Sequence, residues 1–208
     1  ESMTDGAAVT DALAASADVV ARYQGGPNAG HSVIYRGETL VLHLVPSGVL
    51  SPATRCLVGN GVVIDLPKFR AEVEGLEAKG LVVRSRLAGS RAAHLILPYH
   101  RAVEAVAERQ AGAIGTTGRG IGFAYRDKAA RTGIRVDDLF DAQGFVTQVE
   151  RNLAHLRREY PDADLAAMSG ESLHAELADD ARWLEPMVLD VSLALHRAGG
   201  LKNLLLNP

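Results

Sequence analysis

Two glycine-rich segments carry the residues best suited to binding an anion. The first, residues 24–31 (QGGPNAGH), follows an apolar run and places Asn28 and His31 among glycines that include Gly30. Backbone N–H groups in such a loop can approach an anion closely, and the amide and imidazole add directed hydrogen bonds. The same residues also fit a tight turn with a capping Asn28 and a half-buried His31. Short glycine patterns leave both interpretations open.

The second segment, residues 116–122 (TTGRGIG), offers two hydroxyls, exposed amides and a guanidinium within a few residues. Such a set suits a phosphate, and its candidates are Thr116, Thr117, Gly118 and Arg119. A dinucleotide fingerprint is not indicated, because no clear strand precedes the segment and no acidic residue is placed for a ribose. The residues alone predict two polar glycine loops that converge on a phosphorylated ligand.

Other groups of polar residues favour structural roles. His94 and His100 are separated by a strand-to-helix turn, and this is not a recognised metal spacing, so core or capping roles are expected. Arg151, Arg157 and Arg158 alternate with glutamates, which is typical of a solvated helix face. No metal site is predicted.

Alternating strand and helix patterns predict an α/β fold that positions the two glycine loops. Four glycines within residues 115–122 predict no regular structure there unless something holds the segment. The expected helices are 10–17, 69–78 after Pro67, 99–110, 145–160 and 171–198. The expected strands are 18–23, a hairpin of 31–35 and 39–45 around Arg36 and Gly37, 55–65 with a turn at Asn60 and Gly61, 81–87, 94–97 and 204–206.

Bulk composition indicates one ordinary globular unit. The 208 residues are 47% hydrophobic and 23% charged, and the net charge of −3 gives no electrostatic reason to expect nucleic acid or an anionic membrane as partner. No apolar stretch of about 18 residues occurs, and the only cysteine, Cys56, excludes an internal disulfide. We therefore expect a cytoplasmic protein with a buried, inert thiol. The single domain is expected to span 3–208, with Glu1 and Ser2 a cloning remnant.

Five blocks, taken together, resemble adenylosuccinate synthetases in order and spacing. They are residues 19–46, 59–65 (GNGVVID), 93–101 (AHLILPYHR), 115–128 (GTTGRGIGFAYRDK) and 130–136 (ARTGIRV). The resemblance runs from about residue 10 to residue 206 and weakens after Asp141. It implies a mostly parallel central sheet with a β-hairpin excursion and a helical C-terminal portion.

The resemblance also implies a ligand and a chemistry. Family members couple IMP to aspartate with GTP and magnesium, and their dimers share active sites. The residues matching nucleotide or phosphate contacts are Asn28, Gly30, Thr116, Thr117, Gly118 and Arg119. Arg131 resembles the arginine that reaches across the dimer to the nucleotide of the partner subunit. His31 resembles the histidine that assists phosphoryl transfer, as a positioned donor stabilises charge on the migrating group.

Two departures from the family pattern bear on function. Where the family has Gly-Asp-Glu-Gly-Lys-Gly-Lys, residues 2–8 here place Met3 at the aspartate position and Gly6 and Ala8 at the lysine positions. The GTP and magnesium site is therefore expected to be lost. Residues 201–206 (LKNLLL) resemble the strand before the family's Glu-Gly-Ala-Gln loop. The family's half beyond that loop, which carries aspartate and guanine contacts, is therefore expected to be absent.

Three functions remain open at this stage. The first is a repurposed or catalytically impaired paralogue that keeps an IMP-like pocket and forms a homodimer covering its exposed sheet edge. The second is a specialised ligase that is completed by a separate C-terminal-half chain or uses an already activated substrate. The third is an interaction subunit of a full-length synthetase. Ordinary ligase activity by this chain alone is not expected.

Overall fold

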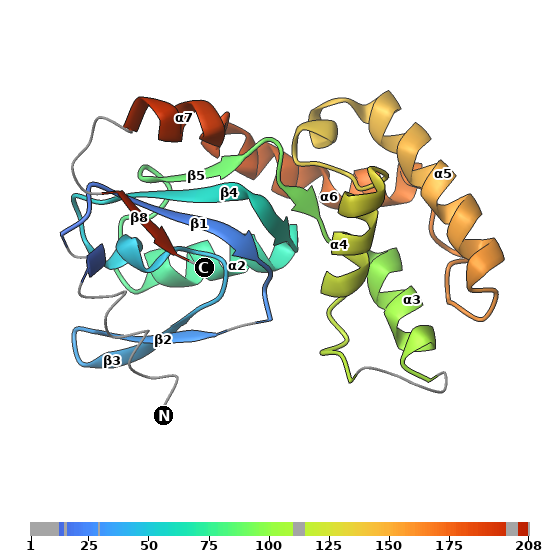
Figure 1. The fold of residues 1–208 in the computed structure, drawn as a ribbon, viewed down its shortest axis with the longest axis horizontal. Coiled ribbons are helices and arrows are strands. Elements are labelled where there is room, and N and C mark those ends of the chain that lie inside the picture. Colours follow the sequence, from blue (N-terminus) through green and yellow to red (C-terminus); the bar gives the residue numbers. More distant parts are fainter. Residues whose placement is uncertain (1–12, 15, 29, 110–114, 199–203, 208) are drawn as a thin grey trace.

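A mostly parallel sheet forms the centre of the fold in the computed structural model, which describes residues 13–14, 16–28, 30–109, 115–198 and 204–207 (Figure 1). The main strand order is β7 (Val188–Leu189), β5 (Leu87–Ser90), β4 (Arg55–Ile64), β1 (Val19–Gly25) and β8 (Leu204–Asn207). A further strand, β6 (His94–Leu95), pairs with the end of β4, and each of these pairs is parallel. The predicted α/β class and parallel sheet are confirmed.

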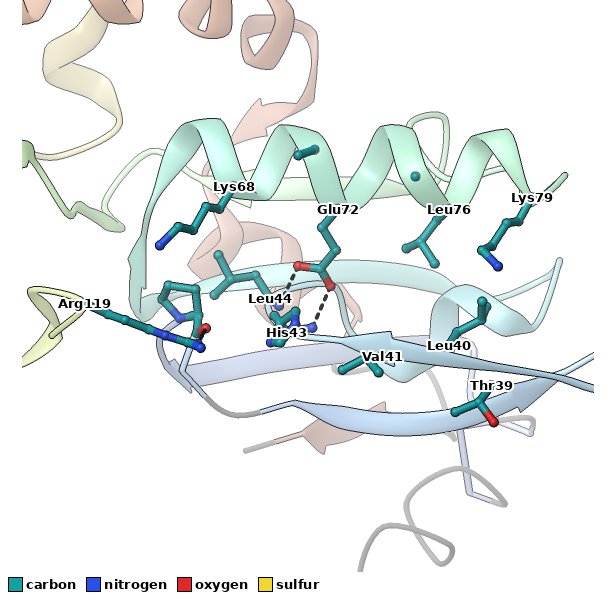
Figure 2. Close-up of a pocket in the computed structure, with 13 residues that line it drawn as sticks. Thr39, Leu40, Val41, His43, Leu44, Lys68, Glu72, Leu76, Lys79 and Arg119 are labelled. Atoms are coloured by element: carbon teal, nitrogen blue, oxygen red, sulfur yellow. Dashed lines mark hydrogen bonds between the residues drawn. The ribbon is translucent and has the colours of Figure 1, made fainter. Parts of the chain in front are cut away.

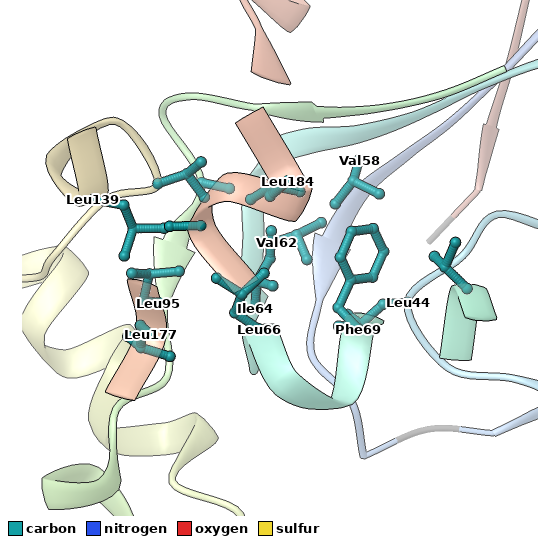
Figure 3. Close-up of a cluster of buried hydrophobic side chains, with 14 of the residues drawn as sticks. Leu44, Val58, Val62, Ile64, Leu66, Phe69, Leu95, Leu139, Leu177 and Leu184 are labelled. Carbon is teal, nitrogen blue, oxygen red and sulfur yellow. The ribbon is translucent and has the colours of Figure 1, made fainter. Parts of the chain in front are cut away.

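Helices cover both faces of the sheet because successive strand residues point to opposite sides. In β4, Val58 packs in the same cluster as Phe69 of α2 (Leu66–Ala78), while Leu57 belongs to a separate cluster with Val191 of α7 (Val191–Ala198). Figure 3 shows the α2 side, where Val58, Val62, Ile64, Leu66 and Phe69 lie together. The continuous apolar run of β4 reflects this burial on both faces.

The predicted turn at Asn60 and Gly61 is wrong, since β4 runs unbroken from residue 55 to residue 64. The register between β1 and β4 shifts after Arg22, so that the two strands stay paired across an irregularity. A Cβ on Gly61 would lie 2.1 Å from the carbonyl oxygen of Tyr23. Glycine is therefore required by the close approach of a neighbouring backbone, not by chain reversal.

The predicted hairpin is confirmed as β2 (His31–Tyr35) paired with β3 (Glu38–Leu42). Arg36 and Gly37 have φ angles of 51° and 83°, which a two-residue loop of type I′ requires at both positions. The hairpin lies beneath α2 in the view of Figure 1. Its residues Val33, Leu40 and Leu42 are buried in the main core.

Four helices form a second group at one side of the sheet (Figure 1). They are α3 (Pro98–Ala107), α4 (Ile121–Ala130), α5 (Ala142–Glu159) and α6 (Gly170–Leu184). Asp141 caps α5 by accepting from the Gly144 amide at 3.0 Å, and Ser169 caps α6 by accepting from the Ser172 amide at 3.1 Å. The helix at 121–130 was not expected from the sequence.

Two further expectations are wrong. The strand expected at 81–87 begins only at Leu87, because residues 81–83 have no regular structure and residues 84–86 form a turn. In this turn the Arg84 amide donates to the Glu77 carboxylate at 3.1 Å. The helix expected at 171–198 is broken at Pro186 by a 3₁₀ turn, η3 (Glu185–Met187), and by β7. Half of the helix expected at 10–17, residues 10–12 and 15, lies outside the described residues.

Burial of Cys56 is confirmed, and that burial raises the pKa of its thiol to about 12. A thiol held so far from ionisation is a poor nucleophile. Within the described ranges, none of the helices has the length and apolar character needed to cross a bilayer.

Candidate functional site

The first glycine-rich loop leaves the carboxyl end of β1, a central strand of the sheet. Gly25 ends that strand with φ of 102°, a backbone conformation that favours glycine. Asn28 and Gly30 are exposed, and His31 opens β2 in a half-buried position. Ligands of open parallel sheets bind at this edge, so the placement fits a binding loop.

The second glycine-rich loop, residues 115–120, runs directly into α4. Thr116, Thr117 and Gly118 are exposed, whereas Gly120 is buried. The Gly120 amide donates to the buried carboxylate of Glu104 at 2.6 Å, which fixes the start of α4 against α3. This holds in place a segment that its three glycines would otherwise leave flexible.

The structure brings the two loops into contact. The guanidinium of Arg119 donates to the carbonyl oxygen of Pro27. A Cβ on Gly26 would lie 3.2 Å from two side-chain carbons of Ile121, so the loops also pack closely without hydrogen bonds. These contacts place Arg119 and the start of α4 beside residues 26–27, which directly precede Asn28 in the sequence.

Tyr125 is a positioning residue that sequence reasoning missed. Its hydroxyl accepts from the Gly25 amide at 2.8 Å and lies 2.9 Å from the Gly61 carbonyl oxygen, to which it can donate. Side chains of α4 therefore hold the first loop and β4 as well. Only the aromatic character of the segment FAY before the next charged run was visible in the sequence.

A buried polar pair joins α3 to α4 beneath the second loop. His100 accepts from the Leu97 amide at 2.9 Å through Nδ1, so its Nε2 carries the proton and donates to Asp127 at 3.1 Å. Burial lowers the pKa of His100, which favours this neutral form. His94, the other histidine considered as a ligand, is also buried and lies 3.2 Å from Lys128 Nζ through Nδ1. Both histidines have the structural roles expected of them.

A groove of about 550 Å³ lies between β3 and α2, beside the loops (Figure 2). Its wall is fixed by Glu72, whose carboxylate accepts from the amides of residues 43, 44 and 45 at 2.7, 2.9 and 3.1 Å. Burial raises the pKa of Glu72 despite these three bonds. Arg119 and Pro27 line one end of the groove, so it adjoins the contact between the glycine loops.

Arg131 is not brought together with the glycine loops. It caps the C-terminal end of α4, whereas the second loop precedes the N-terminal end. A helix of 10 residues separates the two by about 15 Å at 1.5 Å per residue. Arg131 instead lines a separate cavity of about 340 Å³ between α4 and α5.

Comparisons with known proteins agree on one family. The family model described as adenylosuccinate synthetase matches residues 6–207. The adenylosuccinate synthetase of Moorella thermoacetica is 49% identical over 198 residues, covering 91% of this chain and 45% of the relative. That of Synechococcus elongatus is 45% identical, covering 91% of this chain and 43% of the relative. The chain spans about half the length of the curated relatives it matches.

Solved structures give the same result. The structure of fully ligated adenylosuccinate synthetase from Plasmodium falciparum matches with a TM-score of 0.81 at 29% identity, covering 96% of this chain and 47% of that chain. Succinoaminodeoxyadenylate synthetase of cyanophage S-2L, bound to dGMP and dATP, matches with a TM-score of 0.59 at 22% identity. The second match covers 96% of this chain and 45% of that chain, and it bears on the fold alone.

Proposed function

This chain belongs to the adenylosuccinate synthetase family, and we propose that it binds a purine nucleoside monophosphate such as IMP between its two glycine-rich loops. The observation that carries the proposal is the hydrogen bond from Arg119 to the Pro27 carbonyl, which joins loops more than 80 residues apart in sequence. Asn28 and Gly30 supply donors from one loop. Thr116, Thr117 and Gly118 supply hydroxyls and amides from the other.

No comparable observation supports the binding of GTP and magnesium by this chain. Residues 2–8 contain no lysine or arginine, so this segment offers no cation to a triphosphate. In the described ranges, no cluster of three His, Cys, Asp or Glu side chains is arranged to hold a metal. Residues 2–8 therefore do not fit the GTP and magnesium of the family, and the proposed ligand is a monophosphate.

Arg131 is proposed to act in a homodimer. About 15 Å of helix separates it from the second glycine loop, a span too long for contacts to one phosphate. A second copy of the chain would present its own nucleotide to Arg131. Light scattering tests this part directly, since a monomer at all accessible concentrations contradicts it.

Calorimetric titration of the chain with IMP, inosine and GTP tests the ligand. We expect IMP to bind, and inosine to bind more weakly because it lacks the phosphate. The additional phosphates of GTP should not increase its affinity above that of IMP. Thr117→Val should weaken IMP binding by roughly tenfold, because it removes a hydrogen bond to a charged group. Thr147→Val, on α5 and away from the loops, is the matched control. Absence of IMP binding at millimolar concentration would refute the proposal.

A ligase function is the second candidate, favoured by the place of His31 directly after the first loop. A specialised enzyme would form a C–N bond between IMP and an amine such as aspartate, either with a separate chain supplying the missing contacts or from an already activated purine. Product formation from IMP, GTP and aspartate by this chain alone would show that residues 2–8 are not needed. Tight binding to a full-length synthetase without nucleotide would instead favour an interaction subunit.

A further inference from the structure

The exit of the first glycine-rich loop, Gly30 and His31, packs against the end of β3. His31 is paired with Leu42, the last residue of that strand. A Cβ on Gly30 would lie 2.9 Å from Cγ1 of Val41 and 3.4 Å from Cε1 of His43, so the loop backbone lies directly on these two side chains. The position of the end of β3 therefore determines where Gly30 and His31 lie.

The entry of the same loop is fixed by a different element, α4. The Tyr125 hydroxyl accepts from the Gly25 amide at 2.8 Å, and the Arg119 guanidinium donates to the Pro27 carbonyl. Both contacts are made at or before Pro27. The loop thus depends on α4 at its entry and on β3 at its exit.

Glu72 of α2 holds the backbone that follows β3 (Figure 2). Its Oε1 accepts from the amides of residues 43 and 45 at 2.7 and 3.1 Å, and its Oε2 accepts from the amide of residue 44 at 2.9 Å. Residue 43 directly follows the strand partner of His31. Both side-chain oxygens are used as acceptors, which a carboxylate allows and an amide side chain does not.

The charge of Glu72 also acts on the strand that leads into the loop. Arg22 of β1 is buried, and its Nε donates to the Gln24 carbonyl at 3.3 Å, just before the loop begins. Burial lowers the pKa of Arg22, and the negative charge of Glu72 opposes this shift. A neutral side chain at position 72 would leave the buried guanidinium with less compensation.

We propose that Glu72 is a positioning residue of the first glycine-rich loop, setting the places of Gly30 and His31 through the end of β3. It acts through the backbone of residues 43–45 and is not itself a ligand contact. The inference rests on the proposed function for the ligand that the loop binds. The loop position that it asserts can be measured without any ligand.

The test compares Glu72→Gln with Glu74→Gln, its matched control. Glu74 lies on the same helix, and its side chain is 48% exposed in an ion pair with Arg70. In Glu72→Gln the side-chain NH₂ group replaces one acceptor. We therefore expect faster solvent exchange at one or more amides of residues 43–45, and shifted NMR signals of the Gly30 amide and the His31 ring.

IMP affinity is measured by calorimetry on the same variants, well below their melting temperatures. Glu72→Gln should weaken IMP binding roughly tenfold, a size typical of changes that act on a site without touching its ligand. Glu72→Asp keeps both acceptor oxygens on a shorter side chain, so its affinity should lie between those of Glu72→Gln and the unmodified chain. If Glu72→Gln does not fold, the same signals in Glu72→Asp decide the question.

The Gly30 and His31 signals separate positioning from a merely structural contact. A structural contact would lower the melting temperature but leave both signals of the folded protein unchanged, and that result overturns the inference. Shifted signals that are absent from Glu74→Gln support it, and an accompanying loss of IMP affinity ties the loop position to the proposed ligand. If the unmodified chain does not bind IMP, the proposed function fails, and the two signals still test the role of Glu72.

Discussion

The hydroxyl oxygen of Tyr125 lies 2.8 Å from the amide nitrogen of Gly25, and this contact ties α4 to the first glycine-rich loop. The same oxygen lies 2.9 Å from the Gly61 carbonyl oxygen on β4. One side chain thus sets the direction in which the loop leaves β1. Arg119 lies just before the same helix and contacts Pro27, so α4 holds the two candidate binding loops next to each other.

Tyr125→Phe should lower the free energy of unfolding by about 1–3 kcal/mol, because partly buried backbone groups of Gly25 and Gly61 lose their partner. IMP affinity should fall as well, since the loop loses its anchor. Urea unfolding and calorimetry measure the two effects. Tyr23→Phe is the control: Tyr23 is 44% exposed, and its substitution should change stability by less than about 0.5 kcal/mol. Equal stability of the two variants would contradict the role of Tyr125.

Arg86 holds together the chain segment before β4. Its guanidinium donates to the carbonyls of Val49, Ser51 and Thr54 at 2.8, 2.6 and 2.7 Å. Arg86→Lys should lower the free energy of unfolding by about 2 kcal/mol, because an ammonium cannot reach the same set of acceptors. Arg84→Lys is the matched control, since its ion pair with Glu77 is exposed and such pairs contribute less than about 1 kcal/mol. Urea unfolding of both variants compares them, and equal losses would exclude a special role for Arg86.

Elements with local signals were predictable from the sequence. Strand β1 is predicted by its apolar run, because a buried strand needs apolar residues. The turn at Arg36–Gly37 is predicted because a two-residue hairpin loop favours glycine. The bulge at Gly61 was not predictable, since its cause is the Tyr23 carbonyl on a neighbouring strand. A glycine-containing dipeptide therefore marks a chain reversal at residues 36–37 but a close backbone approach at residues 60–61.

Parts of the candidate site were predictable for a similar reason. The glycine loops were predictable because the glycines themselves indicate a loop. The roles of Tyr125 and Glu104 were not, because Tyr125 contacts Gly25, 100 positions away, and Glu104 contacts Gly120, 16 positions away. The charged neighbours of Arg151 predict a solvated helix face, and the residue is exposed in the structure. Its place in the lining of a cavity depends on how α4 packs against α5, which the pattern of α5 alone does not contain.

His94 makes stability depend on pH. Burial, followed by the charges of Lys128 and Arg135, lowers its pKa from 6.5 to about 4. Between these values the unfolded chain binds a proton that the folded chain does not, so the contribution is complete above pH 6.5 and is lost as pH falls towards 4. His94→Asn should flatten the pH dependence in this window by on the order of 2 kcal/mol. Urea unfolding from pH 4 to pH 7 measures it, and parallel curves for the two proteins would refute the assignment.

Alanine substitutions at Gly118 and Gly120 distinguish the cost of backbone strain from the cost of steric conflict in the second loop. Both have positive φ, 66° and 76°, so alanine costs about 1–2 kcal/mol at either position. A Cβ on Gly118 meets no atom within 4 Å, whereas one on Gly120 would lie 2.9 Å from His100 Cβ, inside a packed core. Gly120→Ala should therefore cost a further 1–3 kcal/mol or so in urea unfolding. It should also weaken IMP binding more than Gly118→Ala, because displacing Gly120 from Glu104 moves Arg119 away from Pro27. Equal effects of the two substitutions would mean that α3 does not position the loop.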